Sequence, residues 1–241
     1  WLNCNMDPRK TSSIINLQEQ MVETRKWKAI RGLEVKDENC RLCGEYSETV
    51  EHILAGCRVI AGTEYLRRHD NALKVLAVAW CKQQGILDDS VLWYKQKWGK
   101  GHVIEGNESK MLWDFEYKLR VTERARRPDL TLEDGANKKI WILDMACPQE
   151  HNISDKHREK LNKYQQLTFT TREKRPGYDV EIVPLIIGCL GGGMKRLEEQ
   201  VAKIMNDRKD VEGVCQNMQK TVLMESETIM RKFMSGIIQQ S

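Results

Sequence analysis

Residues 140–146 read IWILDMA, a continuous apolar run that is interrupted only by the acidic residue Asp144. A short apolar run bounded by turn residues is typical of a strand that is buried on both faces. A turn centred on Asp134-Gly135 precedes the run, and residues 129–132 before that turn form a short possible strand. We therefore expect a buried hairpin at the centre of the fold.

The segments around this hairpin predict an α/β fold with a mixed sheet. Residues 111–122 alternate apolar and polar side chains and predict another strand. Residues 154–167 predict a helix, and residues 180–187 predict a strand that ends at the glycine cluster 188–193. The resulting order β-β-β-α-β-α is that of a mixed α/β sheet.

Helical segments are expected on both sides of this core. Residues 11–32 predict one helix that starts near Thr11 or Ser12 and stops at Gly32, and residues 59–83 predict a helix or helix pair. Residues 195–229 place apolar side chains three and four apart, which fits a packed helix pair or a partner-binding coiled coil. The turn-rich residues 99–109 predict a linker. The expected organisation is a helical linker (1–36), a cysteine-rich knuckle (37–58), a helical connector (59–98), an α/β core (110–194) and a C-terminal helical segment (195–241).

The composition is that of a globular protein. The chain has 241 residues, of which 40% are hydrophobic and 31% charged, and its net charge of +4 favours no partner by itself. No apolar stretch approaches the ~18 residues of a membrane span, so we expect no membrane association. The eight cysteines are mostly scattered, which predicts a reducing compartment rather than secretion. The first residues, WLNC, have neither Met nor the features of a signal peptide, so we expect a fragment.

Four metal-ligand residues lie close together in the knuckle. Cys40 and Cys43 form a C-x2-C turn, and His52 and Cys57 follow at a spacing that can complete a tetrahedral shell. Gly44 permits the sharp turn after the second cysteine. The alternative is a set of unrelated core thiols. The spacing predicts a structural Zn²⁺ site, because a closed shell of four protein ligands leaves no position for chemistry.

Two carboxylates and a lysine face point to a second site. Asp129 begins the first hairpin strand and Asp144 ends the second, so both project to one end of the sheet and could share Mg²⁺ through oxygen ligands. The following helix carries Lys156, Lys160 and Lys163 on one face, within a basic stretch that suits a phosphate backbone. From spacing alone, an ordinary turn aspartate, a strand cap and a solvated lysine face remain the alternative.

The order of these motifs resembles the C-terminal region of LINE-type (non-LTR) retrotransposon polyproteins, the lineage with a CCHC zinc knuckle followed by a restriction-like endonuclease. The resemblance covers about residues 11–200. It rests on CRLCG at 40–44, ETVEHILAGC at 48–57, RPDL at 127–130, ILDMACP at 142–148, EKLNKY at 159–164 and VPLIIGCLG at 183–191.

The resemblance implies a PD-(D/E)xK nuclease fold that nicks target DNA, so that the 3′-hydroxyl primes an upstream reverse transcriptase domain. Asp129 and Asp144 would bind Mg²⁺ or Mn²⁺, Lys160 would be the catalytic lysine, and Lys163 and Tyr164 would assist substrate contact. Ala146 stands where the simple pattern has lysine, so the choice among Lys156, Lys160 and Lys163 stays open. The implied partners are DNA, element RNA and the polymerase domain, and the implied location is the nucleus.

Several further residues are weaker candidates. His151 and His157 are either general bases or surface groups, and Glu150 could be a third oxygen ligand. Arg126, Arg127 and Lys156 are candidates for phosphate contact near the metal end of the sheet. The aromatic residues Trp113, Phe115 and Tyr117 are either core residues or stacking platforms for bases. The competing functions are a catalytically silent nucleic-acid-binding module or mobile-element relic, and a purely structural zinc-stapled scaffold.

Overall fold

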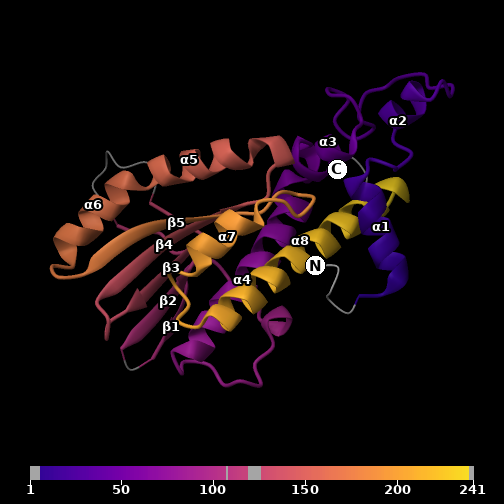
Figure 1. Ribbon diagram of the computed structural model, residues 1–241. Helices are drawn as coiled ribbons and strands as arrows, with labels where there is room; N and C mark the ends of the chain where they lie inside the picture. Colours follow the sequence, from indigo (N-terminus) through magenta and orange to yellow (C-terminus); the bar gives the residue numbers. More distant parts are fainter. Residues whose placement is uncertain (1–5, 107, 119–125, 239–241) are drawn as a thin grey trace.

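The computed structural model describes residues 6–106, 108–118 and 126–238, and its centre is a mixed five-stranded sheet (Figure 1). The strands lie in chain order, with β1 to β4 antiparallel to their neighbours and β5 parallel to β4. The mixed α/β class predicted from the sequence is confirmed. The strands are β1 (His102–Glu105), β2 (Ser109–Trp113), β3 (Leu130–Asp134), β4 (Lys139–Ala146) and β5 (Asp179–Ile186).

Helices cover both faces of the sheet and extend away from it to form the knuckle region (Figure 1). The α-helices are α1 (Pro8–Gln18), α2 (Arg25–Ile30), α3 (Val50–Ala55), α4 (Leu66–Gln83), α5 (Ile153–Lys163), α6 (Gln165–Lys174), α7 (Met194–Val201) and α8 (Arg208–Met234). The 3-10 turns are η1 (Arg58–Ile60), η3 (Trp93–Lys95) and η4 (Glu150–Asn152), and the π-helical turn is η2 (Ala61–Tyr65). None of the helices that the structure describes has the length and apolar character needed to cross a membrane.

Strand β4, which lies between β3 and β5, is buried on both faces, as its apolar run predicts. Trp141 and Leu143 face a core that contains buried side chains of α4, α7 and α8. Ile140 and Ile142 face the other way, against Tyr164 and Leu167 at the end of α5 and in α6. Asp144 shares the face of Ile140 and Ile142 because side chains alternate along a strand, so this carboxylate points toward the α5 layer.

The longest helix, α8, connects the sheet to the knuckle. Its first half, including Val214 and Met218, belongs to the sheet core. Its second half, including Ile229 and Phe233, packs against the knuckle and Leu17 of α1. The periodicity of residues 195–229 allowed two alternatives. The structure contains one of them, a packed helix pair formed by α7 and α8.

Two expectations for the first half of the sheet are wrong. The linker expected at 99–109 contains β1 and the start of β2, because β1 is defined by its pairing with β2, which a turn-rich sequence does not reveal. The strand expected at 111–122 ends at Trp113, where Asp114 takes a left-handed φ of 47°. Leu119 and Val121 lie outside the described residues.

Two expected helices are each divided into two. The helix expected at 11–32 is α1 and α2, separated where Gln20 adopts a φ of 56°. Asp7, rather than Thr11 or Ser12, caps α1, and Thr24 caps α2 through its side-chain oxygen. The helix expected at 154–167 is broken at the buried residue Tyr164, which ends α5 and precedes α6.

Candidate functional site

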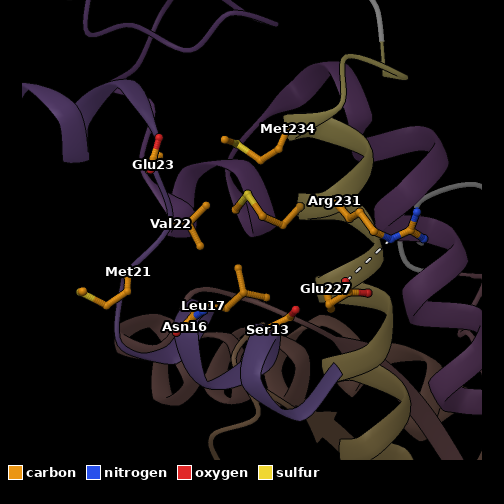
Figure 2. A pocket seen from close by; sticks show the side chains of 10 residues that line it. Ser13, Asn16, Leu17, Met21, Val22, Glu23, Glu227, Arg231 and Met234 are labelled. Carbon is orange, nitrogen blue, oxygen red and sulfur yellow. Dashed lines mark ion pairs between the residues drawn. The ribbon is translucent and has the colours of Figure 1, made fainter. Parts of the chain in front are cut away.

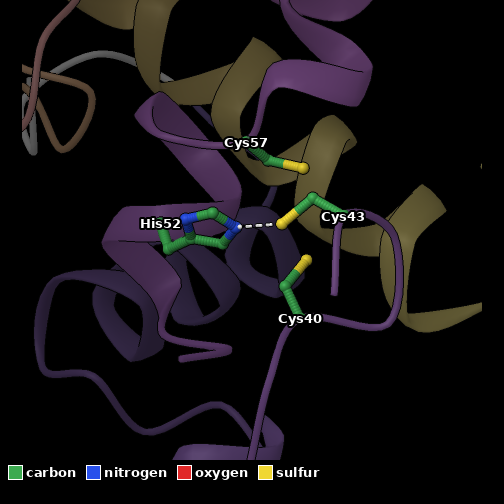
Figure 3. A group of neighbouring side chains, drawn as sticks. All are labelled: Cys40, Cys43, His52 and Cys57. Carbon is green, nitrogen blue, oxygen red and sulfur yellow. Dashed lines mark hydrogen bonds between the residues drawn. The ribbon is translucent and has the colours of Figure 1, made fainter. Parts of the chain in front are cut away.

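The knuckle brings four ligand residues together. The ligand atoms of Cys40, Cys43, His52 and Cys57 all lie within 4.8 Å of one another, and Cys43 Sγ lies 3.3 Å from His52 Nε2 (Figure 3). Three sulfur atoms and one imidazole nitrogen are a donor set that suits tetrahedral Zn²⁺. The cluster that the sequence predicts is therefore assembled, and it could hold a metal such as zinc.

Local interactions of the backbone shape this cluster. Gly44 has a φ of 69°, a left-handed conformation that lets the chain reverse immediately after Cys43. Thr49 caps α3 by accepting a hydrogen bond from the His52 backbone N–H, which places the imidazole on the first turn of the helix. The fully buried Glu48 accepts bonds from the backbone N–H groups of Arg25 and Arg41 and from the Arg41 guanidinium. This structural role of Glu48 was not predicted from the sequence.

The protonation of the cluster depends on its burial. Burial raises the pKa of the Cys57 thiol to about 12 and also raises the pKa of Cys40. Burial lowers the pKa of His52, so its imidazole is neutral and can act as a ligand. Metal binding to the buried thiols must therefore release protons.

The second group of residues surrounds Asp144 at the end of β4. The Asp144 side chain is buried, and its carboxylate contacts three groups from the end of α5. Oδ2 forms an ion pair with Lys160, and Oδ1 lies 3.1 Å from Lys163 Nζ and 2.6 Å from the Tyr164 hydroxyl. Three side chains that lie 16 to 20 positions after Asp144 in the sequence thus contact its carboxylate. We call Asp129, Asp144, Lys160, Lys163 and Tyr164 the acid centre.

Tyr164 is held as a hydrogen-bond donor. Burial, together with the negative charge of Asp144, raises the pKa of this phenol far above its usual value of 10. Its hydroxyl lies 2.6 Å from Asp144 Oδ1 and 3.0 Å from the Arg127 carbonyl oxygen. A phenol that stays protonated orients the carboxylate and does not act as a base at neutral pH.

Asp129 lies opposite Asp144 at the same end of the hairpin. The register pairs Leu130 with Leu143, so Asp129, which precedes Leu130, is next to Asp144 across the two strands. Cβ atoms of directly opposed residues are about 5 Å apart. Asp129 Oδ2 accepts hydrogen bonds from the Met145 backbone N–H, at 2.7 Å, and from His69 Nε2, at 2.9 Å.

His69 is a residue of this site that was not predicted from the sequence. This residue lies on α4, and its Nδ1 lies 2.9 Å from Asp70 Oδ1. Burial favours the neutral imidazole, but the hydrogen bonds to Asp129 and Asp70 outweigh burial and raise the pKa of His69 to about 10. The same bond lowers the pKa of Asp129 despite its burial. The available signal was a polar run, Arg67 to Asp70, within a helix that is otherwise apolar on one face.

A cleft of ≈ 360 Å³ opens beside Asp129. Lys156 lines it together with His69, and the Lys156 ammonium is paired with Glu159 at 2.6 Å. Arg127 pairs with Asp114, and Arg126 lies 3.8 Å from Glu116. Of the three candidates for phosphate contact, the structure places Lys156 in the cleft. The remaining wall of the cleft comprises mainly apolar side chains: Ala55, Ala61, Tyr65, Leu66, Ala146, Cys147 and Pro148, with the buried Arg68.

Three weaker candidates lie away from the two carboxylates. Glu150 is not a third ligand of the acid centre, because its Oε1 accepts the Leu190 backbone N–H at 2.7 Å and its carboxylate fills the space left by Gly188 and Gly192. His157 is partly buried, and burial lowers its pKa. His151 is exposed in the short turn η4.

The three aromatic candidates are not equivalent. Trp113 is buried in the sheet core, as expected for an aromatic residue in a strand. Tyr117 packs beside the core formed with α6, and Phe115 meets it edge-to-face at 5.4 Å between ring centroids. Of the three rings, Trp113 is thus inaccessible as a stacking platform.

The donor set of the acid centre fits a hard divalent cation. Carboxylate oxygens are the ligands that Mg²⁺ and Mn²⁺ prefer, and Asp129 and Asp144 are adjacent across the hairpin. The Lys160 ammonium is the partner of the buried Asp144 Oδ2. Asp144 can bind a cation only if its lysine partners shift, whereas the hydrogen bonds that Asp129 accepts from described residues are both on Oδ2.

A separate groove of ≈ 430 Å³ lies between α1 and the end of α8 (Figure 2). Met21, Met234 and Val22 give it a soft apolar lining, and Glu227 and Arg231 form an ion pair of 3.8 Å at its edge. Its acidic residues, Glu23 and Glu227, are not part of a cluster of three or more metal-ligand residues among the described residues, so we assign the chemistry to the knuckle and the acid centre.

Comparisons with known proteins add no assignment. No family model matches the chain, and no curated protein matches it.

Proposed function

We propose that this chain is a divalent-metal-dependent DNA endonuclease with a structural zinc knuckle, of the restriction-like type found in non-LTR retrotransposons. The observation that carries the proposal is the meeting of Lys160, Lys163 and Tyr164 on the carboxylate of Asp144, beside Asp129. The proposal includes the PD-(D/E)xK core, DNA as substrate, and element RNA and an upstream reverse transcriptase domain as partners. Its setting would be the nucleus, where the nick primes reverse transcription.

Each residue of the acid centre would have a different role in phosphodiester hydrolysis. A divalent cation held by Asp129 and Asp144 would act as a Lewis acid and would lower the pKa of a bound water. Lys160, whose side chain is only 15% exposed, would neutralise negative charge that develops on the phosphate. Lys163 is 40% exposed and can reach the DNA backbone. Tyr164 fixes the orientation of Asp144.

The surrounding charges support a nucleic-acid substrate. Lys156 lies in the cleft beside Asp129 and is one turn before Lys160 on the same helical face. Arg126 and Arg127 lie at the same end of the sheet, because they immediately precede Pro128 and Asp129. These cations would hold the phosphate backbone near the two carboxylates.

One observation favours a second candidate, a catalytically silent nucleic-acid-binding module. Among the described residues, only the knuckle brings three or more His, Cys, Asp or Glu ligand atoms within 4.8 Å of one another. In the acid centre, Asp144 is neutralised by two lysines and Asp129 by His69. A centre in which both lysines stay on Asp144 would bind DNA without cutting it.

A plasmid-nicking assay separates the two candidates. The zinc-loaded chain is incubated with supercoiled plasmid and Mg²⁺, Mn²⁺ or no divalent cation, beside the variants Asp129→Asn and Asp144→Asn. We expect metal-dependent nicking that both variants abolish, with DNA affinity changed by no more than a few-fold. The matched control is Asp155→Asn, which removes an exposed carboxylate of α5 that pairs with Arg158.

The assay also defines the results that contradict the proposal. Nicking by Asp144→Asn at the rate of the unmodified chain would assign the activity to a contaminant or to other residues. Salt-sensitive DNA binding without nicking under any metal would favour the silent binding module.

A further inference from the structure

His69 connects α4 to the acid centre across 60 residues of sequence. Its Nε2 lies 2.9 Å from Asp129 Oδ2 and its Nδ1 lies 2.9 Å from Asp70 Oδ1, so both ring nitrogens are engaged by carboxylates. The ring lines the cleft and is 19% exposed. An imidazole with both nitrogens hydrogen-bonded has a fixed ring plane. His69 therefore also restricts the orientation of the Asp129 carboxylate.

The two hydrogen bonds to Asp129 converge on a single oxygen atom. His69 Nε2 and the Met145 backbone N–H both donate to Oδ2, at 2.9 and 2.7 Å. Oδ1 accepts no hydrogen bond that the structure assigns among the described residues. The carboxylate is therefore held by one oxygen while the other remains available, and its side chain is still 26% exposed toward the cleft.

We propose that His69 is a positioning residue of the acid centre, which holds Asp129 by Oδ2 so that Oδ1 is presented to a divalent cation. This inference rests on the proposed nuclease function and adds a residue of α4 to it. Hydrogen bonds to metal-binding side chains orient them, and losing such a partner typically costs about 10–100-fold in metal affinity or activity. Asp70 contributes by fixing the orientation of the imidazole.

The placement of the neighbouring residue supports a specific role for His69. Arg68 is fully buried, and its guanidinium bonds to Ser226 Oγ at 3.0 Å and to the Cys147 carbonyl oxygen at 3.3 Å. These bonds tie α4 to α8 and to the end of β4. Arg68 thus fixes how α4 is rotated, while His69 is left at the cleft, in contact with Asp129.

The test compares two substitutions of His69. Gln can still donate an N–H to Asp129, whereas Ala cannot. We measure Mn²⁺ affinity of the zinc-loaded chain by electron paramagnetic resonance, kcat and KM for nicking, and the thermal unfolding midpoint. The matched control is His102→Ala, which removes an exposed histidine of β1 that stacks on Trp98.

We expect His69→Ala to weaken Mn²⁺ binding and to lower kcat by about 10–100-fold, the usual effect of removing a residue that orients a metal ligand. KM for the plasmid should change by no more than a few-fold, because the imidazole does not contact DNA in this role. His69→Gln should recover most of both losses, and His102→Ala should match the unmodified chain.

Three results would overturn the inference, and they differ from one another. Equal Mn²⁺ affinity in His69→Ala and the unmodified chain, with weaker binding in Asp129→Asn, would show that Asp129 needs no positioning. Equal losses in His69→Gln and His69→Ala would show that a donated hydrogen bond is not what His69 supplies. Equal Mn²⁺ binding in the unmodified chain and Asp129→Asn would instead remove the proposed function, and the inference with it.

Discussion

The knuckle and the acid centre assemble polar side chains in different ways. The four knuckle ligands come from residues 40–57, and their ligand atoms lie within 4.8 Å of one another. The residues of the acid centre lie just before β3, in β4 and at the end of α5. Each of its two carboxylates forms ion pairs with cationic side chains.

From this difference we expect the fold of the knuckle to depend on a bound metal, whereas the charges of the acid centre are already neutralised by neighbouring side chains. The knuckle offers four electron-pair donors around a small space, so a bound cation is what would join them. In the acid centre, Lys160 and His69 already offset the charges of Asp144 and Asp129. We therefore expect metal removal to affect the fold of the knuckle strongly and the fold of the acid centre weakly.

The largest effect is expected for the double variant Cys40→Ser, Cys43→Ser. Structural zinc contributes roughly 10–16 kcal/mol of apparent binding free energy in small zinc domains, so its loss should unfold residues 37–58. Zinc content and amide hydrogen exchange over this segment measure the effect. Cys81→Ser, at a buried cysteine of α4 outside the cluster, should keep its zinc. One zinc per chain in the double variant would contradict the assignment of the ligands.

A smaller loss of stability is expected for Asp144→Ala. The substitution leaves the ammonium of Lys160, which is 15% exposed, without its carboxylate, and breaking such a pair costs about 3–5 kcal/mol. Urea denaturation of the zinc-loaded chain measures this change, with and without added Mg²⁺. The loss should be present in both conditions, because the lysines already neutralise Asp144.

The control for this prediction is Asp155→Ala. Asp155 is 69% exposed, and such surface substitutions usually change stability by no more than about 0.5 kcal/mol. A loss in Asp144→Ala that appears only with Mg²⁺ present would mean that the cation, rather than Lys160, compensates the carboxylate. The knuckle and the acid centre would then both depend on a bound metal ion for stability.

Local patterns explain how much of the fold could be predicted. The hairpin β3–β4 and the strand β5 were found because an apolar run, a turn and a glycine cluster are each local signals. Strand β1 was missed because its pairing with β2 is a tertiary contact, and the turn residues around it resemble a linker. The break at Tyr164 was missed because the residue is apolar enough to continue a helical pattern, and its buried contact with Asp144 is not visible locally.

The same distinction applies to the two sites. The knuckle ligands were identified by their spacing, since all four lie on one short segment. Asp129, Asp144 and Lys160 were candidates from their positions, but only a resemblance favoured them over an ordinary turn aspartate, a strand cap and a solvated lysine, because their meeting depends on the register of β3 with β4 and on the position of α5. His69 had no such signal, because it reaches Asp129 from a helix on the opposite side of the sheet.

The smallest effect is expected at the junction between the two regions, for Tyr65→Phe. The Tyr65 hydroxyl accepts the Cys57 backbone N–H at 3.0 Å and donates to the Ile53 carbonyl oxygen at 2.7 Å. It joins the knuckle to the chain that leads into α4.

Loss of these bonds in Tyr65→Phe should cost about 1–2 kcal/mol, because two buried backbone groups lose a partner. Within the described ranges, the hydrogen bonds of this hydroxyl all go to knuckle residues, so zinc release to a chelator should become faster while Mn²⁺ affinity is unchanged. The matched control, Tyr94→Phe, alters a tyrosine that is 62% exposed. Weakened Mn²⁺ binding in Tyr65→Phe would mean that the knuckle positions α4 and His69, and that the two regions work as one unit.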